Sequence, residues 1–143
     1  MKSSHPEKSI GFLIYEVSRL MRRDFDQRVQ ALGLTQVQWR AIAHIAHQEG
    51  CKQATLAELL EIKPITLTRL IDRLVDAGWV TRVPDPDDRR AIQLHLTQKA
   101  RPLLDTMQEK ALQTRQKALQ DIGTEEFDVL FATLKTMKNN LSK

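Results

Sequence analysis

The chain has 143 residues, of which 41% are hydrophobic and 28% charged, so it is long enough to bury the core of one ordinary domain. Lys and Arg number 22 against 18 Asp and Glu, and the net charge of +4 suits a polyanionic partner. The single Cys51 excludes an internal disulfide framework and fits a reducing compartment. Neither a membrane-spanning apolar run nor a signal-peptide block is present, so we expect a soluble, cytoplasmic protein.

Two helices are predicted at the start of the chain. Over residues 10–32 the apolar side chains recur at three- and four-residue steps, which is the spacing of an amphipathic helix, and Gly33 stops it. Thr35 and Gln38 have the spacing of a capping box, which opens a second helix that ends near His47. The segment "QEGCKQA" that follows is predicted to be a loop.

Two further helices follow across a tight turn. Thr55 and Glu58 predict another capping box, at the start of the short helix "LAELLEI". Pro64 suits the first position of the next helix, which extends to Ala77 and is stopped by Gly78. Helices arranged in this way are typical of a helix-turn-helix.

A β-hairpin is predicted after this pair of helices. The runs "WVTRV" and "AIQLHL" have β-type composition, and in the second run Ile92, Leu94 and Leu96 alternate with polar residues. The Pro- and Asp-rich segment between the runs is predicted to be the turn. Because an isolated two-stranded hairpin is marginally stable in water, we expect it to pack on the central helices.

The chain ends with two predicted long helices. Thr97 is predicted to cap a helix that ends at Gly123, and Thr124 caps the last one, with Glu125 and Glu126 at its positive end. The first helix and these two carry continuous apolar stripes that are long for so small a body. We therefore expect part of that surface to pair with a second chain.

The helix that begins at Pro64 is predicted to carry basic and hydroxyl side chains on its outward face. With Leu67 at the centre of the buried face, the basic and hydroxyl groups lie outward in the N-terminal half. This face comprises Ile65, Arg69, Asp72, Arg73 and Asp76, flanked by Thr66 and Thr68. In a helix-turn-helix this part of the helix enters the major groove, where Arg can bond to guanine and Thr or Ile can touch a thymine methyl. An isolated pattern of this kind also fits a solvated helix face.

The stretch "RVPDPDDRRAIQLHLT" places Asp85, Asp87 and Asp88 ahead of two arginines, which raises the question of a metal loop or a carboxylate active site. A calcium loop of the EF-hand type needs a glycine at its sharp turn and a bidentate glutamate at its end, and both are missing. Acid–base catalysis by paired carboxylates needs a cleft, which a hairpin tip does not offer. We therefore expect neither an enzyme nor a cofactor.

The chain resembles the MarR/SlyA family of dimeric winged helix-turn-helix transcriptional regulators, and SlyA-like members in particular. The resemblance runs from "LTQVQW" through "LAELLEIKPITLTRLIDRLVDAGWVTR" and "DDRRAIQLHLTQKA" into "RPLLDTM". Its most specific motif is the Asp-x-Arg of Asp88 and Arg90 ahead of Thr97. The resemblance implies a mainly α fold with a small β-hairpin: one domain over residues 1–143, with a winged helix-turn-helix DNA-binding lobe at 35–97 and dimerisation helices at 9–32 and 98–143.

The same resemblance implies roles for individual residues. The hairpin becomes a wing whose tip residue Arg90 enters the minor groove, with Asp88 holding that arginine in position. The helix from Pro64 becomes the recognition helix, with Arg69 as the base reader, and Arg82 and Arg89 add phosphate contacts. The expected DNA-binding residues are Lys63, Pro64, Ile65, Thr66, Thr68, Arg69, Arg73, Arg82, Asp88, Arg89 and Arg90. Expected partners are double-stranded DNA, a second copy of the chain, and a small aromatic or phenolic effector.

Other candidate residues keep alternatives open. His44 and His47 are spaced to share a zinc ion but lack defined further ligands, and Cys51 leaves a redox sensor possible. Trp39 and Trp79 are either core residues or the lining of a ligand pocket. A winged-helix module that binds proteins instead of DNA is the functional alternative, and the salt dependence of DNA affinity separates the two.

Overall fold

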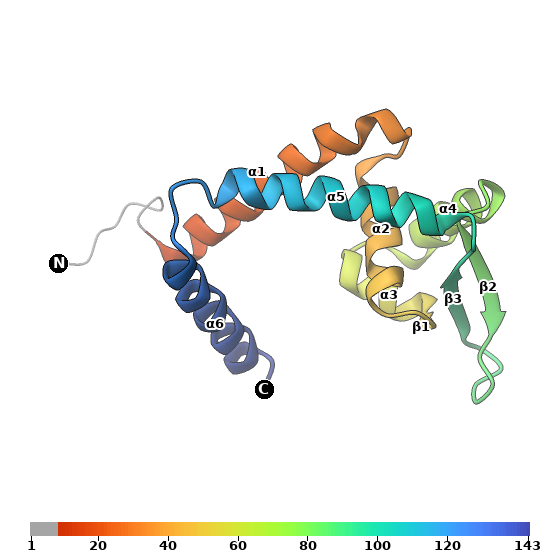
Figure 1. Ribbon diagram of the computed structural model, residues 1–143. Coiled ribbons are helices and arrows are strands. Elements are labelled where there is room, and N and C mark those ends of the chain that lie inside the picture. Colours follow the sequence, from red (N-terminus) through yellow and green to blue (C-terminus); the bar gives the residue numbers. More distant parts are fainter. Residues whose placement is uncertain (1–8) are drawn as a thin grey trace. The chain divides into compact units, whose positions relative to one another are not determined.

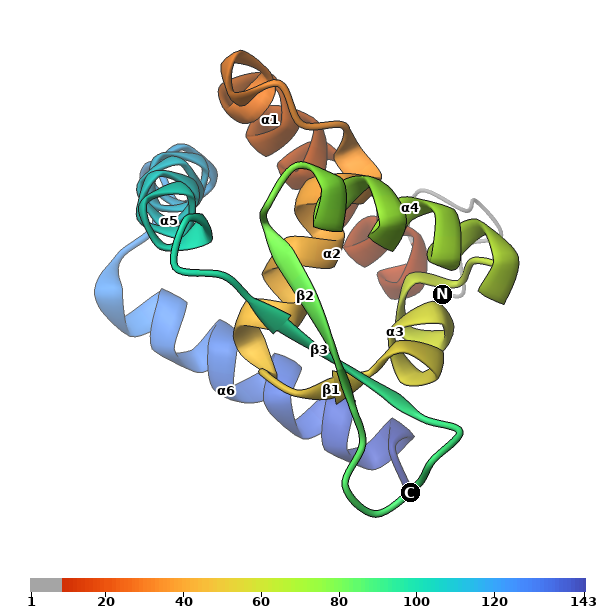
Figure 2. The ribbon, with the colours of Figure 1, turned by 90° about the vertical axis from the view of Figure 1, so that its right-hand side faces the viewer.

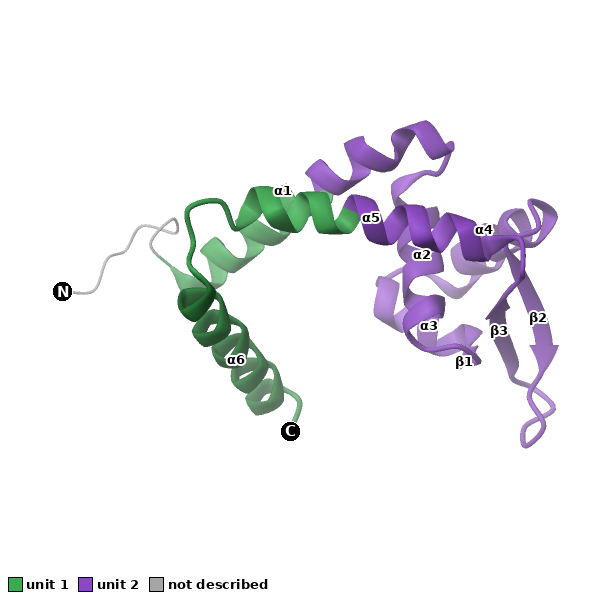
Figure 3. Cartoon of the chain, in the orientation of Figure 1, with its two compact units in different colours: residues 1–22, 111–143 green, residues 23–110 purple. Residues whose placement is uncertain are grey.

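The computed structural model describes residues 9–143, coloured along the chain in Figure 1. The chain divides into two compact units, shown in Figure 3. Unit 1 comprises residues 1–22 and 111–143, and unit 2 comprises residues 23–110. The helices are α1 (Ile10–Val29), a 3-10 turn (Gln30–Leu32), α2 (Gln36–His47), α3 (Gln53–Leu60), α4 (Pro64–Asp76), α5 (Ala100–Ala118) and α6 (Thr124–Leu141), and the strands are β1 (Cys51–Lys52), β2 (Val80–Pro84) and β3 (Ile92–Leu96). The predicted mainly α fold with a small β-hairpin is confirmed.

The core of unit 2 is built from the apolar stripes of α2, α3 and α4 and from the inner face of the hairpin. Its fully buried side chains are Val29, Ile42, Ile45, Leu56, Leu67, Ile71, Leu74, Val80 and Leu94. Trp39 belongs to this core, since its ring meets Phe25 edge to face with 4.4 Å between centroids, and its Nε1 donates to Asp26. The core interpretation of Trp39 is therefore confirmed.

The sheet is larger than the predicted hairpin. β3 pairs antiparallel with β2 on one side and with β1 on the other, where Cys51 lies opposite Leu94. Figure 2 shows the β2–β3 hairpin extending past the helices of unit 2 to the loop between Pro84 and Ile92. The predicted loop "QEGCKQA" thus contains a strand, which is too short to leave a periodic signal in the sequence.

The predicted helix starts meet mixed outcomes. The Thr35–Gln38 capping box is confirmed, with both of its reciprocal hydrogen bonds formed. The Thr55 cap is wrong because α3 follows β1 directly and begins at Gln53, so Thr55 lies inside the helix. Gly78 was predicted to stop α4, and it has a positive φ of 83°, a conformation that suits glycine and lets the chain turn from α4 into β2.

The predicted boundaries around the last two helices are also wrong. Thr97 does not cap α5, which begins at Ala100, because its hydroxyl instead donates to the carbonyl of Gly78. α5 ends at Ala118, before the expected Gly123. Gly123 itself is the N-cap of α6, and Thr124 is the first helical residue. The acidic pair Glu125 and Glu126 does lie in the first turn of α6, as predicted.

In unit 1 the apolar stripes remain open in the single chain. No residue of α6 is buried, and Val129, Phe131 and Leu141 are 67%, 53% and 85% exposed. On α1 the exposed large apolar side chains are Ile10, Phe12, Leu13, Ile14, Tyr15, Val17, Leu20 and Met21. Among the described residues, no helix is both long and apolar enough to cross a membrane.

Candidate nucleic-acid interface

The helix α4 buries the face that the sequence predicts and exposes the other. Leu67, Leu70, Ile71 and Leu74 are buried in the core of unit 2. Pro64 occupies the first turn, which contains no acidic residue, so no carboxylate opposes the positive end of the helix dipole. The predicted residues Lys63, Pro64, Ile65, Thr66, Arg69 and Arg73 are exposed on or beside this helix.

Arg69 and Arg73 are available for an external partner. Within residues 9–143, neither guanidinium forms a hydrogen bond or an ion pair with the protein. The two residues lie four positions apart and therefore share one side of the helix. Unpaired arginines on an exposed helix face suit recognition of a polyanion.

Thr68 differs from its neighbours because its hydroxyl is used inside the protein. It donates to the carbonyl of Pro64 at 3.0 Å, and it accepts from the side-chain amide of Gln53 at 3.2 Å. Gln53 is the first residue of α3, so this contact joins the two helices of the helix-turn-helix. The Thr68 hydroxyl proton is thus directed at the backbone of α4 in this structure.

Arg82 is also engaged within unit 2. Its Nη2 lies 2.6 Å from the carboxylate of Asp72, and its Nε donates to the side-chain oxygen of Gln53 at 3.3 Å. Nη2 further donates to the backbone carbonyl of Thr68 at 3.2 Å. The side chain of Arg82, predicted as a phosphate contact, is 28% exposed and bonded to two helices.

Asp85 organises the tip of the hairpin. One oxygen of its carboxylate accepts from the backbone N–H groups of Asp87 and Asp88, and the other accepts from the side chain of Gln93. The N–H of Asp87 is the main cause that lowers the pKa of the Asp85 carboxyl, assisted by Gln93, Asp88 and the positive charge of Lys52. Asp85 therefore shapes the turn of the hairpin.

Asp88 contacts Arg90, although through a different group than predicted. Its Oδ1 accepts from the backbone N–H of Arg90 at 3.0 Å, and its own carbonyl accepts from the N–H of Ala91. In the part of the chain that the structure describes, the guanidinium groups of Arg89 and Arg90 make no ion pair. In this structure Asp88 therefore contacts the backbone of Arg90, and the role of the pair on DNA stays a prediction.

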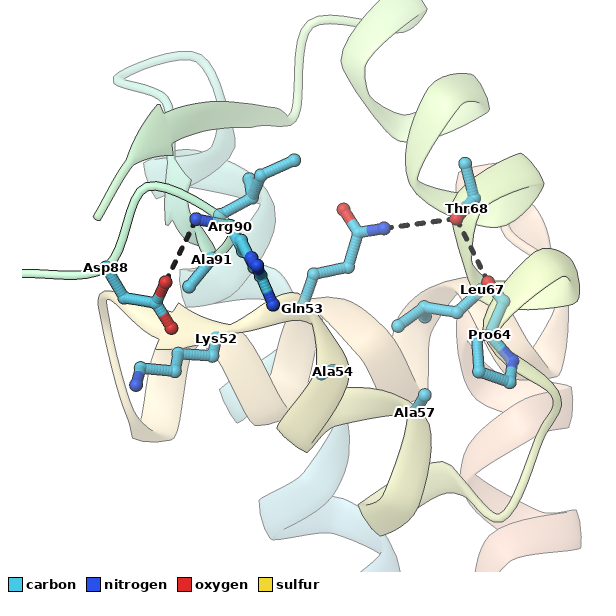
Figure 4. Close-up of a pocket in the computed structure, with 11 residues that line it drawn as sticks. Lys52, Gln53, Ala54, Ala57, Pro64, Leu67, Thr68, Asp88, Arg90 and Ala91 are labelled. Carbon is cyan, nitrogen blue, oxygen red and sulfur yellow. Dashed lines mark hydrogen bonds between the residues drawn. The ribbon is translucent and has the colours of Figure 1, made fainter.

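A hollow of about 340 Å³ connects the hairpin tip with the start of α4. Figure 4 shows Asp88 and Arg90 on one side and Pro64 and Thr68 on the other, with Gln53 between them. The remaining lining residues are Lys52, Ala54, Ala57, Leu67, Ala91 and Ile92. The exposed end of α4 and the tip of the hairpin therefore border one concave surface.

The alternative sensing residues have less support. Cys51 is buried in β1 at 8% exposure, and burial raises the pKa of its thiol, which is the opposite of what a reactive thiolate needs. Burial is also the main cause that lowers the pKa of His44, followed by the charges of Arg40 and His47. Among the described residues, no group of three or more His, Cys, Asp or Glu side chains gathers to hold a metal ion.

One contributing residue, Gln53, was not among the predicted site residues, and a second, Trp79, was a candidate whose role the sequence left open. Gln53 was placed in a loop because of the misassigned cap at Thr55, and a lone glutamine carries no motif. Trp79, whose role was open, is partly buried against the core, and the ammonium of Lys99 lies 4.6 Å from its ring centroid while donating to the carbonyl of Ala77. These contacts join residues that are distant in sequence, so no local pattern announces them.

The helix pair α3–α4 followed by the β2–β3 hairpin, with β1 completing a small antiparallel sheet, defines a winged helix-turn-helix protein. A model of the MarR family matches residues 34–92. The structure of the transcriptional regulator PA3341 is similar along almost the whole chain, with 32% identity and a TM-score of 0.82 over 94% of this chain and 98% of that one. The chain belongs to the MarR family.

Two structures of MarR from E. coli are also similar. Apo wild-type MarR is 26% identical, with a TM-score of 0.78 over 90% of this chain and 96% of that one. A cysteine-to-serine mutant of MarR complexed with operator DNA is 25% identical, with a TM-score of 0.74 over 94% of this chain and 99% of that one. The winged-helix arrangement found here is therefore similar to that of a protein seen on DNA.

Proposed function

We propose that the protein is a sequence-specific, double-stranded DNA-binding transcriptional regulator that acts as a homodimer on a pseudo-palindromic operator. The observation that carries this proposal is the shared concave surface between the exposed start of α4 and the hairpin tip. Arg90 lines this surface on the hairpin side, and Arg69 and Arg73 are exposed on the same helix as its lining residues Pro64 and Thr68. The similarity to a MarR protein complexed with operator DNA supports DNA as the partner.

In this proposal α4 is the recognition helix and enters the major groove. Arg69 faces outward in its N-terminal half, where a guanidinium can bond bidentately to guanine. Lys63 and Arg73 lie at positions from which they can reach phosphates, while Ile65, which is 62% exposed, offers apolar contact to a thymine methyl. The positive end of the helix dipole, free of acidic residues in the first turn, adds attraction for a phosphate.

The hairpin is the wing, and Arg90 is the residue that we place in the minor groove. A narrow minor groove concentrates negative potential and attracts arginine. Asp88 contributes by fixing the backbone from which the Arg90 side chain projects, and Asp85 fixes the turn before it. Arg89, exposed beside Arg90, contacts the phosphate backbone in this arrangement.

A second copy of the chain is the partner that we propose for unit 1. The open apolar stripes of α1 and α6 need cover, because monomeric proteins rarely expose contiguous apolar surface of this kind. A two-fold dimer carries two recognition helices, so its operator is a pseudo-palindrome with half-sites about 10 bp apart. We also propose that a small aromatic or phenolic effector regulates binding, and that the protein acts in the cytoplasm, as in the family.

The test is selection of bound duplexes from a random pool, followed by measurement of affinity against salt. Enrichment of a palindromic consensus, with affinity that falls steeply as log salt rises, is the expected result. Negligible affinity for any duplex at low salt would support a protein-binding module instead. Addition of a salicylate-like compound is expected to shift the operator affinity and the Tm, and a compound series that alters neither would remove effector control of that class.

A further inference from the structure

One arginine in unit 2 ties three structural elements together. Arg82 projects from β2 and contacts Asp72 and the Thr68 carbonyl of α4, as well as the side chain of Gln53 at the start of α3. We infer that these residues form a clamp that fixes the recognition helix relative to the wing, and that Arg82 is a positioning residue and not a phosphate contact. The inference rests on the proposed function, because it assigns a role within the same DNA-binding surface.

The side-chain amide of Gln53 is held in one orientation by hydrogen bonds at both of its ends. Its oxygen accepts from Arg82, while its nitrogen donates to the hydroxyl of Thr68. Both ends of one planar group are therefore used, and a reversed amide would present a donor to a donor. The contact places α3, α4 and β2 in one defined arrangement, as Figure 4 shows for Gln53 and Thr68.

The position of the clamp along α4 explains why it matters. The covalent link from α4 to β2 is the turn at Gly78, after the C-terminal end of the helix. The N-terminal half, which carries Arg69, lies far from that turn and would swing furthest if the helix pivoted there. Arg82 attaches near the middle of the helix, at Thr68 and Asp72, and so restricts that motion. Preorganised side chains lose less entropy on binding, which favours the specific complex.

The clamp also changes the charge that Arg82 presents. Asp72 forms an ion pair with its guanidinium, so the net charge of the pair is close to zero and its attraction for a distant phosphate is weak. A residue that neutralises a phosphate adds to the salt dependence of binding, whereas a positioning residue alters discrimination between sequences. The two roles therefore predict different measurements.

The experiment compares Arg82→Lys, Arg82→Ala and Asp72→Asn in the full-length protein, on the selected operator and on a random duplex. Lysine keeps the charge but cannot reproduce the fork that meets Gln53 and α4. We expect Arg82→Lys to lower the ratio of operator to random-duplex affinity about tenfold, with an unchanged salt slope. Asp72→Asn should lower the same ratio and strengthen random binding, because Arg82 is released. Arg89→Ala serves as the phosphate-contact comparison, and Arg19→Lys, in the Glu16 ion pair of α1, as the matched control.

An Arg82→Lys protein with wild-type discrimination, together with an Arg82→Ala protein that loses affinity equally on both duplexes and about one unit of salt slope, would overturn the clamp. Hydrogen–deuterium exchange without DNA provides a second readout, independent of the proposed function. In Gln53→Ala and Asp72→Asn, the amides of residues 67–72, which begin with the hydrogen bond from Leu67 to Lys63, should exchange faster, while Tm changes little. Unchanged exchange there would refute the clamp, whereas a wild-type protein that binds no duplex refutes the DNA-binding proposal alone.

Discussion

Asp88 holds Arg90 by its backbone: the carboxylate accepts the N–H of the residue two positions on, at 3.0 Å, while within residues 9–143 the guanidinium makes no ion pair. The contact is an Asx-turn, in which an aspartate side chain replaces a backbone acceptor. A free guanidinium at the tip of a fixed turn can adapt to a groove, whereas one paired with a carboxylate would have to break that pair. The Asp88 contact therefore fixes the backbone of the wing without neutralising the charge of Arg90.

The operator affinity of Asp88 variants should consequently depend on whether the new side chain can accept a hydrogen bond, and not on its charge. In Asp88→Asn the side-chain oxygen still accepts from the N–H of Arg90 and a negative charge near DNA is lost, so operator affinity should equal or exceed that of the wild type. Asp88→Ala loses the turn contact, and we expect a drop of about threefold to tenfold. Fluorescence anisotropy with labelled operator measures both. Weaker binding by Asp88→Asn would show that the carboxylate charge itself orients Arg90.

Arg69→Ala tests base reading by the recognition helix. Loss of a bidentate contact to guanine should cost about 1–3 kcal/mol on the operator and relax selectivity at one base pair of each half-site, while random-duplex binding persists. Repeating the duplex selection with the variant identifies that base pair. If affinity instead falls by the same factor on every sequence, Arg69 contacts phosphate.

The apolar surface of α6 predicts the oligomeric state. Leu130 and Leu134 are 45% and 40% exposed and lie one turn apart, so a Leu130→Glu, Leu134→Glu double variant places two charges on the same stripe. We expect sedimentation to show a dimer for the wild type and a monomer for this variant, with operator affinity reduced at least a hundredfold as one half-site is lost. An Ala132→Glu, Asn139→Glu double variant, which adds the same two charges on the opposite, exposed side of the helix, is the matched control. A wild-type monomer at micromolar concentration would contradict the dimer.

The wing should respond to acid through Asp85. The pKa of its carboxyl in the folded chain lies below the ordinary value of 3.8, mainly because the N–H of Asp87 donates to it. Its contribution to wing stability is therefore present above pH 3.8 and is lost as pH falls through the lower folded-state pKa. The amide signals of Asp87 and Asp88 should move together across that acidic range in NMR spectra. In Asp85→Asn this movement should disappear, and its persistence would assign the titration to another group.

Sequence pattern predicted the elements well where burial repeats along the chain. The stripe of Leu67, Leu70, Ile71 and Leu74 set the face of α4, and alternation at Ile92, Leu94 and Leu96 predicted β3. A predicted helix start was correct only where the threonine hydroxyl bonds within the predicted cap. Thr35 bonds locally and was predicted correctly, whereas the hydroxyl of Thr97 bonds to Gly78 across the fold. A distant partner leaves no signal in local spacing.

The candidate site shows the same division. The exposed arginines follow from helix periodicity and from the Asp-x-Arg motif, and their roles on DNA stay predictions. The engagement of Arg82 with Asp72 and Gln53 could not be predicted, because it depends on three elements meeting in space. Charge counts alone treat Arg82 like Arg89, although one is bonded inside unit 2 and the other is exposed.

The small sheet also limits how copies of this chain can associate. β3 is paired on both sides, so only β1 and β2 present outer edges. One of these edges is two residues long, and the other ends in Pro84, which has no N–H to donate. Such edges are poor templates for another strand, and continuous β-pairing between molecules, the usual route to aggregation, is disfavoured. The hairpin can therefore stay exposed to an external partner without offering a long, regular edge for pairing between copies of the chain.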